Sequence, residues 1–206
     1  MSDKALDDIV AELEEYGCHT IILYGSRARG DYTDLSDYDV IGIRTEGESF
    51  RIARYEERNQ VYFDLFVYSE VDFITIQEAH LNIHEGKILI EKNQFGQKLL
   101  ERVNKEIKKP VFLSKNELEV RKVWYEKMLN RAKRRDIEGV YRHIWMLHTL
   151  IEDYFAVRNI RYLGPKKGLQ YLSQHAPEII SLYEKALIDT QNLTVLEKLI
   201  QSIFVV

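Results

Sequence analysis

The chain has 206 residues, 45% of them hydrophobic, which suffices for one large core or two modest ones. A net charge of −4 and an isoelectric point near 5.9 provide no global basic field, so a long nucleic acid is not an expected partner. The single cysteine, Cys18, excludes an internal disulfide and is interpreted as a buried structural residue. No apolar stretch approaches the ~20 residues of a membrane span and no signal-peptide pattern is seen, which predicts a cytoplasmic protein without a membrane partner.

Residues 1–110 show mixed helical and strand patterns. Hydrophobic residues recur at helical spacing between Leu6 and Tyr16, with Ser2 as a candidate cap and Gly17 placed to end the helix. Apolar runs then predict four strands, over residues 19–24, 38–44, 61–68 and 87–91. Helical segments are expected at 74–84 and 97–108, whereas 50–55 fits either a strand or a helix.

The pattern becomes helical after Pro110. The stretch Ser114-Lys-Asn-Glu117 forms a capping box before a long amphipathic helix, and Asp136 is placed to cap a second helix that runs through Val157. Prolines and a second capping box predict three further helices, beginning near 165, 177 and 194. The expected fold is therefore α+β, with a small mixed β-sheet domain over 1–110 and an antiparallel helical bundle over 111–206.

The turn after the first predicted strand contains the residues that indicate a binding site. Gly25 and Ser26 lie where the chain must turn, and backbone N–H groups freed there can face an anion. Asp37 and Asp39 enter the next strand, where a period of 2 places both carboxylates on one face, roughly 6.6 Å apart. Two oxygen ligands beside a phosphate cradle suit Mg²⁺, which prefers one or two carboxylates plus substrate phosphates.

Gly25-Ser26 followed by Ser36-Asp37-Tyr38-Asp39 resembles the signature of the DNA polymerase β-like nucleotidyltransferase superfamily. The whole stretch 25–30 is most similar to the small bacterial branch, with its minimal and kanamycin-type antibiotic nucleotidyltransferases. The resemblance implies a third carboxylate on a later, adjacent strand. Asp64, the only charge in the apolar run 61–68, is the candidate, because a charge there is costly without a metal or partner.

The resemblance also implies a reaction, the transfer of a nucleoside monophosphate from an NTP such as ATP to a hydroxyl. Asp37 and Asp39 would bridge two Mg²⁺ ions, and Asp64 would ligate the ion nearer the acceptor and activate its hydroxyl. Gly25 and Ser26 would hold the β- and γ-phosphates, with Arg27 or Arg29 stabilising the departing pyrophosphate. The acceptor, an antibiotic-like small molecule or a protein hydroxyl, and the NTP are left open by the sequence.

In kanamycin-type enzymes a helical C-terminal domain completes the acceptor pocket, often across a homodimer interface, so a homodimer is an open alternative here. Basic residues cluster around a helix break, at Arg158, Arg161 and Lys166, and are candidates for holding an anionic acceptor or the nucleotide phosphates. Glu152, in the preceding helix, either orients the acceptor hydroxyl or faces solvent. The general base is therefore either Asp64 or a glutamate of the C-terminal domain.

Two other classes of function compete. Arg142 and His148 fit the loose Arg-polar-x4-His pattern of HEPN ribonuclease domains, but on an unbroken helix residues six apart lie about 120° from each other. A non-catalytic nucleotide-binding or antitoxin-type partner is the third class. Three retained aspartates disfavour it, because an inactive site has no reason to keep like charges together.

Overall fold

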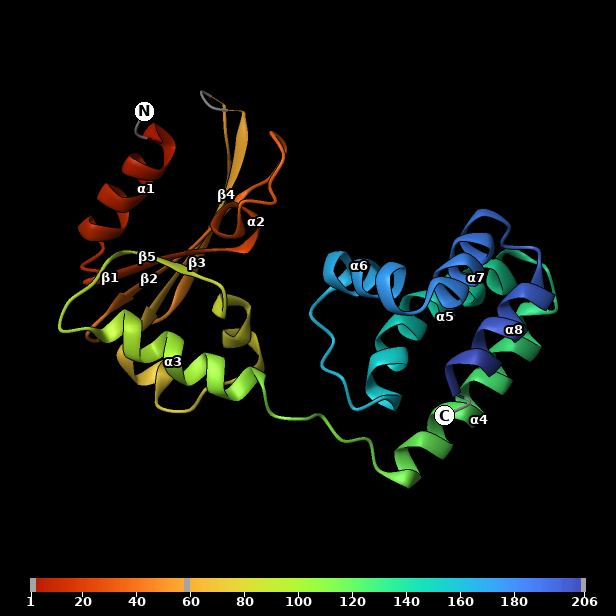
Figure 1. The fold of residues 1–206 in the computed structure, drawn as a ribbon. Coiled ribbons are helices and arrows are strands. Elements are labelled where there is room, and N and C mark those ends of the chain that lie inside the picture. The colour runs from red at the N-terminus through yellow and green to blue at the C-terminus, as the bar shows by residue number, and fades with distance from the viewer. Residues whose placement is uncertain (1–2, 58–59, 205–206) are drawn as a thin grey trace. The chain divides into compact units, whose positions relative to one another are not determined.

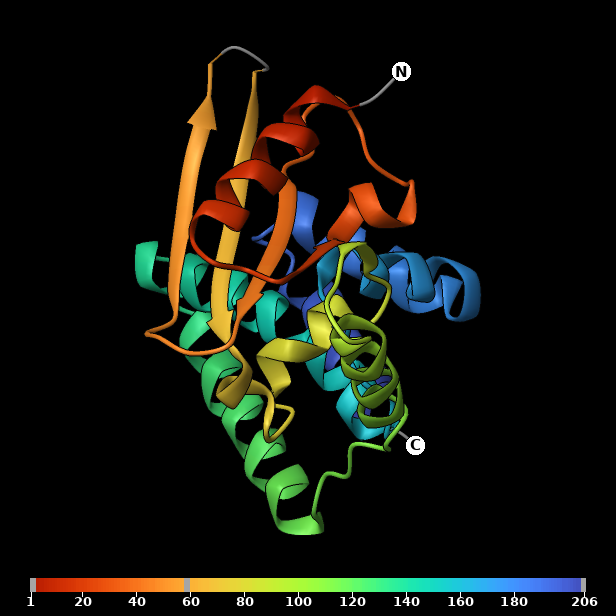
Figure 2. The ribbon, with the colours of Figure 1, turned by 90° about the vertical axis from the view of Figure 1, so that its left-hand side faces the viewer.

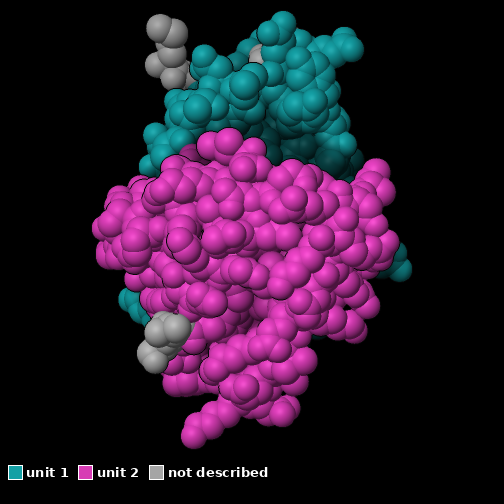
Figure 3. All heavy atoms as spheres, turned by 90° about the vertical axis from the view of Figure 1, so that its right-hand side faces the viewer, with its two compact units in different colours: residues 1–109 teal, residues 110–206 magenta. Residues whose placement is uncertain are grey.

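The computed structural model describes residues 3–57 and 60–204, which form two compact units, one ending at Lys109 and the other beginning at Pro110 (Figure 3). The first unit contains a mixed β-sheet with helices, and the elements described in the second unit are helical (Figure 1). The α+β class predicted from the sequence is therefore confirmed. Among the described residues, no helix is at once long and apolar enough to cross a membrane.

A five-stranded sheet organises the first unit. Its strands are β1 (Thr20–Tyr24), β2 (Tyr38–Arg44), β3 (Phe50–Glu56), β4 (Val61–Ser69) and β5 (Lys87–Ile90), in the order β3-β4-β2-β1-β5. Strands β2 and β4 run parallel, whereas the other neighbouring pairs are antiparallel. The ambiguous segment 50–55 is thus an edge strand, paired with β4 along its whole length.

The two faces of the sheet are covered differently. Helix α1 (Lys4–Glu15) packs on one face, where Ile9 and Leu13 join the side chains that β2 and β4 turn that way. Figure 1 shows helix α3 (Phe95–Ile107) on the opposite side of the sheet, and the short 3-10 helices η1 (Glu70–Phe73) and η2 (Glu78–Ile83) pack in the same cluster. The β3–β4 hairpin lies beside α1 (Figure 2), and Arg54 of β3 pairs with Glu12.

Local details of the first unit differ from the sequence prediction. The predicted cap, Ser2, lies outside the described residues, and Asp3 caps α1 by accepting from the Leu6 N–H at 3.3 Å. Tyr16 is 41% exposed, because α1 ends one residue earlier. The expected helical segment at 74–84 forms 3-10 turns rather than one α-helix. Cys18 is buried, as predicted.

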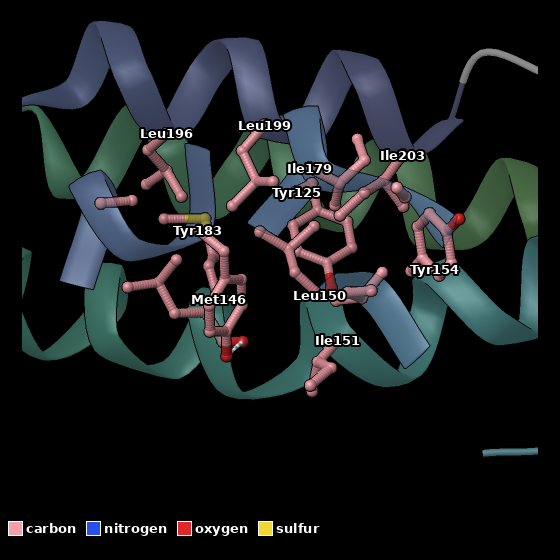
Figure 4. Close-up of a cluster of buried hydrophobic side chains, with 14 of the residues drawn as sticks. Tyr125, Met146, Leu150, Ile151, Tyr154, Ile179, Tyr183, Leu196, Leu199 and Ile203 are labelled. Atoms are coloured by element: carbon pink, nitrogen blue, oxygen red, sulfur yellow. Dashed lines mark hydrogen bonds between the residues drawn. The ribbon is translucent and has the colours of Figure 1, made fainter. Parts of the chain in front are cut away.

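The second unit contains α4 (Lys115–Ala132), α5 (Ile137–Val157), α6 (Pro165–His175), α7 (Pro177–Ile188) and α8 (Leu193–Phe204). Its core draws side chains from all five of these helices (Figure 4). Apolar residues do not all point into this core: Val120 and Val123 of α4 and Ile144 of α5 are more than half exposed. Tyr125 of α4 and Met146 of α5 are buried in it.

A buried carboxylate ties α4 to α5. Asp153 of α5 accepts from the Arg121 guanidinium and from the Tyr125 hydroxyl, and Tyr125 is itself hydrogen-bonded to Thr149 at 2.8 Å. The Asp153 side chain is only 8% exposed. Its neighbour Glu152 is exposed, so the two adjacent acids differ in role.

Replacing Asp153 with Ala is expected to lower the free energy of unfolding by about 2–4 kcal/mol, because the buried Tyr125 hydroxyl and the Arg121 guanidinium both lose their acceptor. Glu152→Ala is the matched control and should change it by less than about 0.5 kcal/mol. Urea unfolding followed by circular dichroism measures both. Equal effects of the two substitutions would contradict the structural role of Asp153.

Candidate functional site

The turn after β1 is a short helix rather than a loop. Helix α2 (Gly25–Arg29) starts directly after Tyr24 and ends at Gly30, whose N–H donates to the Ser26 carbonyl at 2.9 Å. Gly25 has φ +70°, a conformation that side-chain-bearing residues rarely adopt. A Cβ on Gly25 would also overlap Oδ2 of Asp39. Glycine is required here because the Asp39 carboxylate lies directly against the backbone.

Two of the three predicted aspartates belong to the parallel strands β2 and β4, and the third, Asp37, lies just before β2. In the sheet register Asp39 of β2 lies between Tyr24 of β1 and Asp64 of β4. Because residues side by side in a sheet project to the same face, the Asp39 and Asp64 carboxylates point to one side. Asp37 immediately precedes β2 and acts on the Asp39 carboxylate through its charge. Asp37, Asp39 and Asp64 are all half-buried.

This grouping leaves excess negative charge. The pKa of Asp39 is raised to about 6, mainly because burial disfavours its charged form and then because Asp37 and Asp64 repel it. The positive charges of Arg29 and Arg51 act in the opposite direction. Burial and the nearby Asp39 and Asp64 also raise the pKa of Tyr24. A cation at this point of the sheet would be favoured electrostatically.

The sequence analysis missed Arg51. This residue of β3 pairs with both oxygens of Asp64: Nε donates to Oδ1 at 2.6 Å and Nη2 to Oδ2 at 2.8 Å. Its guanidinium also lies 5.0 Å from the centroid of the Phe66 ring. The sequence left 50–55 ambiguous between strand and helix. The structure shows that β3 pairs Ala53 with Asp64, and Arg51, two residues from Ala53, therefore projects to the same face as Asp64.

The two arginines of α2 are used differently. Arg27 donates to the backbone carbonyls of Ser36 and Asp37 at 2.8–3.1 Å and stacks on the Tyr38 ring, 3.8 Å from its centroid. It therefore fixes the loop that delivers Asp37. Arg29 pairs with Asp31 at 3.2 Å and with Glu85 at 3.7 Å, and its positive charge acts to lower the pKa of Asp39.

The donor set suits a hard divalent cation. Within the described part of the chain, no three His, Cys, Asp or Glu side chains form a group able to hold a metal by themselves. Mg²⁺ does not require such a group, because one or two carboxylates together with substrate phosphates satisfy it. The Asp37 and Asp39 carboxylates fit that role, since they are close enough for the charge of Asp37 to raise the pKa of Asp39 in addition to the larger effect of burial.

The predicted acceptor-side residues are not gathered in one place within the helical unit. Glu152 lines a pocket of about 370 Å³ with Trp124 and Trp145, whereas Arg161 lines another of about 360 Å³ between α5 and α6. Arg158 donates to the carbonyls of Tyr154 and Ile203, which ties α5 to the end of α8. Lys166 lies in the first turn of α6.

Replacing Gly25 with Ala is expected to displace the Asp39 carboxylate and to destabilise the first unit by more than the ~1–2 kcal/mol that the left-handed conformation alone costs. Gly30→Ala is the matched control, because Gly30 has φ +87° but open space around a Cβ. Chemical denaturation of both variants measures the difference. Equal losses would show that the carboxylate does not crowd Gly25.

The folded protein is expected to lose stability as the pH rises from about 4 to about 6. Asp39 keeps its proton up to a pKa of about 6 in the folded state, against 3.8 when unperturbed, so the native state binds more protons in this window. The loss is at most about 3 kcal/mol. Urea unfolding across this pH range should show a flatter profile for Asp39→Asn, and identical profiles would contradict the assignment.

Comparison with known proteins gives a family for the first unit. Residues 7–95 match the family model described as Polymerase beta, Nucleotidyltransferase. No curated protein matches the chain. The crystal structure of a nucleotidyltransferase-like protein from Exiguobacterium sibiricum 255-15 is similar, with 18% identity and a TM-score of 0.43 over 97% of this chain and 74% of that one. The matched segment spans all five strands of the sheet and the three aspartates, and residues 7–95 thus form a domain of the polymerase β-like nucleotidyltransferase superfamily.

Proposed function

We propose that this protein is a Mg²⁺-dependent nucleotidyltransferase that moves a nucleoside monophosphate from an NTP to a hydroxyl group of a small-molecule or protein acceptor. The observation that carries the proposal is the register that sets Asp39 beside Asp64 on one face of the sheet, next to the Gly25 turn. A general nucleotidyl-transfer role agrees with the family of residues 7–95.

In the proposed reaction the acceptor hydroxyl oxygen attacks the α-phosphorus of the NTP. A bond forms between that oxygen and phosphorus, the bond from the α-phosphorus to the bridging oxygen breaks, and pyrophosphate leaves with the electron pair. Bound Mg²⁺, held by Asp37 and Asp39, would neutralise the phosphate charge that three aspartates would otherwise repel. Asp64 would ligate the ion nearer the acceptor and would lower the pKa of the acceptor hydroxyl or take its proton.

The turn at α2 would receive the triphosphate. Gly25 lacks a side chain, so the backbone there lies directly against the Asp39 carboxylate, and the Ser26 hydroxyl follows directly. Arg29 would stabilise the negative charge that develops on the leaving pyrophosphate. Arg27 supports this arrangement indirectly, by donating hydrogen bonds to the backbone carbonyls of Ser36 and Asp37.

The ribonuclease alternative gains no support from the helical unit. Helix α5 is unbroken from Ile137 to Val157, so Arg142 and His148 lie on different faces. Arg142 bonds Glu138 at 3.3 Å and lies over the Trp145 ring, whereas His148 is exposed. We therefore do not propose RNA cleavage.

The decisive experiment measures the melting temperature with each of the four NTPs in the presence of Mg²⁺ or Mn²⁺. One of the NTPs, at about 100 times its Kd, is expected to raise the free energy of unfolding by about 2.7 kcal/mol, because it binds only the folded state. Asp39→Asn should abolish most of this gain, because it removes a carboxylate from the cation site.

Asp34→Asn serves as the control, because Asp34 lies exposed in the loop before Asp37 and should leave the gain unchanged. The transfer itself is followed with α-labelled NTP and a panel of hydroxyl acceptors. An unchanged melting temperature with every NTP and both metals would refute the proposed function.

A further inference from the structure

The contact between Arg51 and Asp64 occupies the carboxylate that the proposed reaction needs. Both Asp64 oxygens accept a hydrogen bond from the same guanidinium, at 2.6 and 2.8 Å. Such a two-point pair is the geometry in which Arg binds carboxylate most strongly. Both oxygens of Asp64 are therefore already used as hydrogen-bond acceptors. The positive charge of Arg51 also occupies the position to which Asp64 would attract a divalent cation.

A guanidinium and a divalent cation cannot both sit against Asp64 without strong repulsion. The side chain that bridges Asp64 is therefore a competitor of the metal rather than part of its ligand set. In the structure the Asp64 carboxylate faces Arg51.

Arg51 is placed so that it can leave. Its side chain is 57% exposed, on an edge strand, whereas Asp64 is only 19% exposed. The contacts that the described structure gives the Arg51 guanidinium are Asp64 and the Phe66 ring, and Asp64 and Phe66 both belong to β4. A rotation about its side-chain bonds would free Asp64 without moving the sheet.

A second arginine on the same strand provides the comparison. Arg54 forms a similar two-point pair with Glu12 of α1 and lies over the Phe63 ring at 5.3 Å. Its partner belongs to the opposite face of the sheet, away from the aspartates, where it ties β3 to α1. Strand β3 thus carries two arginine–carboxylate pairs. The Arg54–Glu12 pair joins β3 to α1, and the Arg51–Asp64 pair lies at the candidate site.

We propose that Arg51 is the counter-ion of Asp64 in the nucleotide-free protein and a positioning residue that releases Asp64 when a divalent cation and nucleotide bind. This inference rests on the proposed function. In the nucleotide-free state the pair keeps Asp64 from binding a divalent cation, and binding of the metal with its nucleotide exchanges one cation for another at the same carboxylate. The released guanidinium then has the nucleotide phosphates as its nearest strong acceptors.

The test measures Mn²⁺ binding to the full chain without nucleotide, by the loss of the free-Mn²⁺ electron paramagnetic resonance signal. Arg51→Gln is expected to raise the Mn²⁺ affinity about tenfold or more, because it removes the competing charge. Arg51→Lys keeps one charge but loses the two-point geometry, so a smaller gain is expected. Arg54→Gln, the matched control, should bind Mn²⁺ like the unaltered protein.

The gain must also depend on Asp64. Combining Arg51→Gln with Asp64→Asn should return the affinity to that of Asp64→Asn alone, which a general change in surface charge would not do. Circular dichroism melts establish that each variant is folded. If Arg51→Gln does not fold, the intermediate gain of Arg51→Lys carries the same test.

An Arg51→Gln protein that is folded but binds Mn²⁺ no more tightly than the unaltered protein would overturn the inference. If the unaltered protein then still binds Mn²⁺ in the presence of an NTP, the proposed function stands and only the exchange at Asp64 is refuted. If no variant binds Mn²⁺ with or without any NTP, both fail.

Discussion

Two carboxylates set side by side in a sheet are the constraint on which the first unit depends. Asp39 and Asp64 are register partners on parallel strands, and the hydrogen bonds of β2 and β4 prevent them from moving apart. Burial, followed by the charges of Asp37 and Asp64, raises the pKa of Asp39. A half-buried pair of carboxylates of this kind favours a cation beside it.

Three arginines surround the Asp39 and Asp64 carboxylates, and each makes a different contact. Arg27 bonds backbone carbonyls and thereby shapes the loop before β2. Arg29 acts on Asp39 through space, and Arg51 bonds Asp64 directly. Arg51 comes from an edge strand and its side chain is 57% exposed, against 23% for Arg29, so its contact can be exchanged without disturbing the core.

The helical unit has a hydrophobic core of its own. Its charged side chains are used differently from those of the aspartate site. Its buried carboxylate, Asp153, is fully occupied by Arg121 and Tyr125, and Arg158 is bonded to helix carbonyls. Its aromatic and basic side chains line two separate pockets, one around Trp124 and Trp145 and the other around Arg161 and Tyr171.

The sequence by itself determined the elements whose signals are local. Apolar runs predicted β1, β2, β4 and β5, the Ser114 capping box and two prolines predicted the starts of α4, α6 and α7, and the Gly25-Ser26 turn with Asp37, Asp39 and Asp64 marked the candidate site. The capping box predicted at the start of the last helix does not form, because α8 already begins at Leu193 and Asn192 accepts from the Val195 N–H instead. The tertiary structure decided which side chains meet across the sheet. Residues 50–56 form a strand because they pair with β4, and Arg51 meets Asp64 through that pairing. Arg27 and Arg158 bond backbone carbonyls that lie 4 to 45 residues away along the chain. Such contacts are set by strand order and helix packing, and neither residue type nor spacing in one sequence encodes them, because the same local pattern is compatible with several registers and several rotations of a helix about its axis.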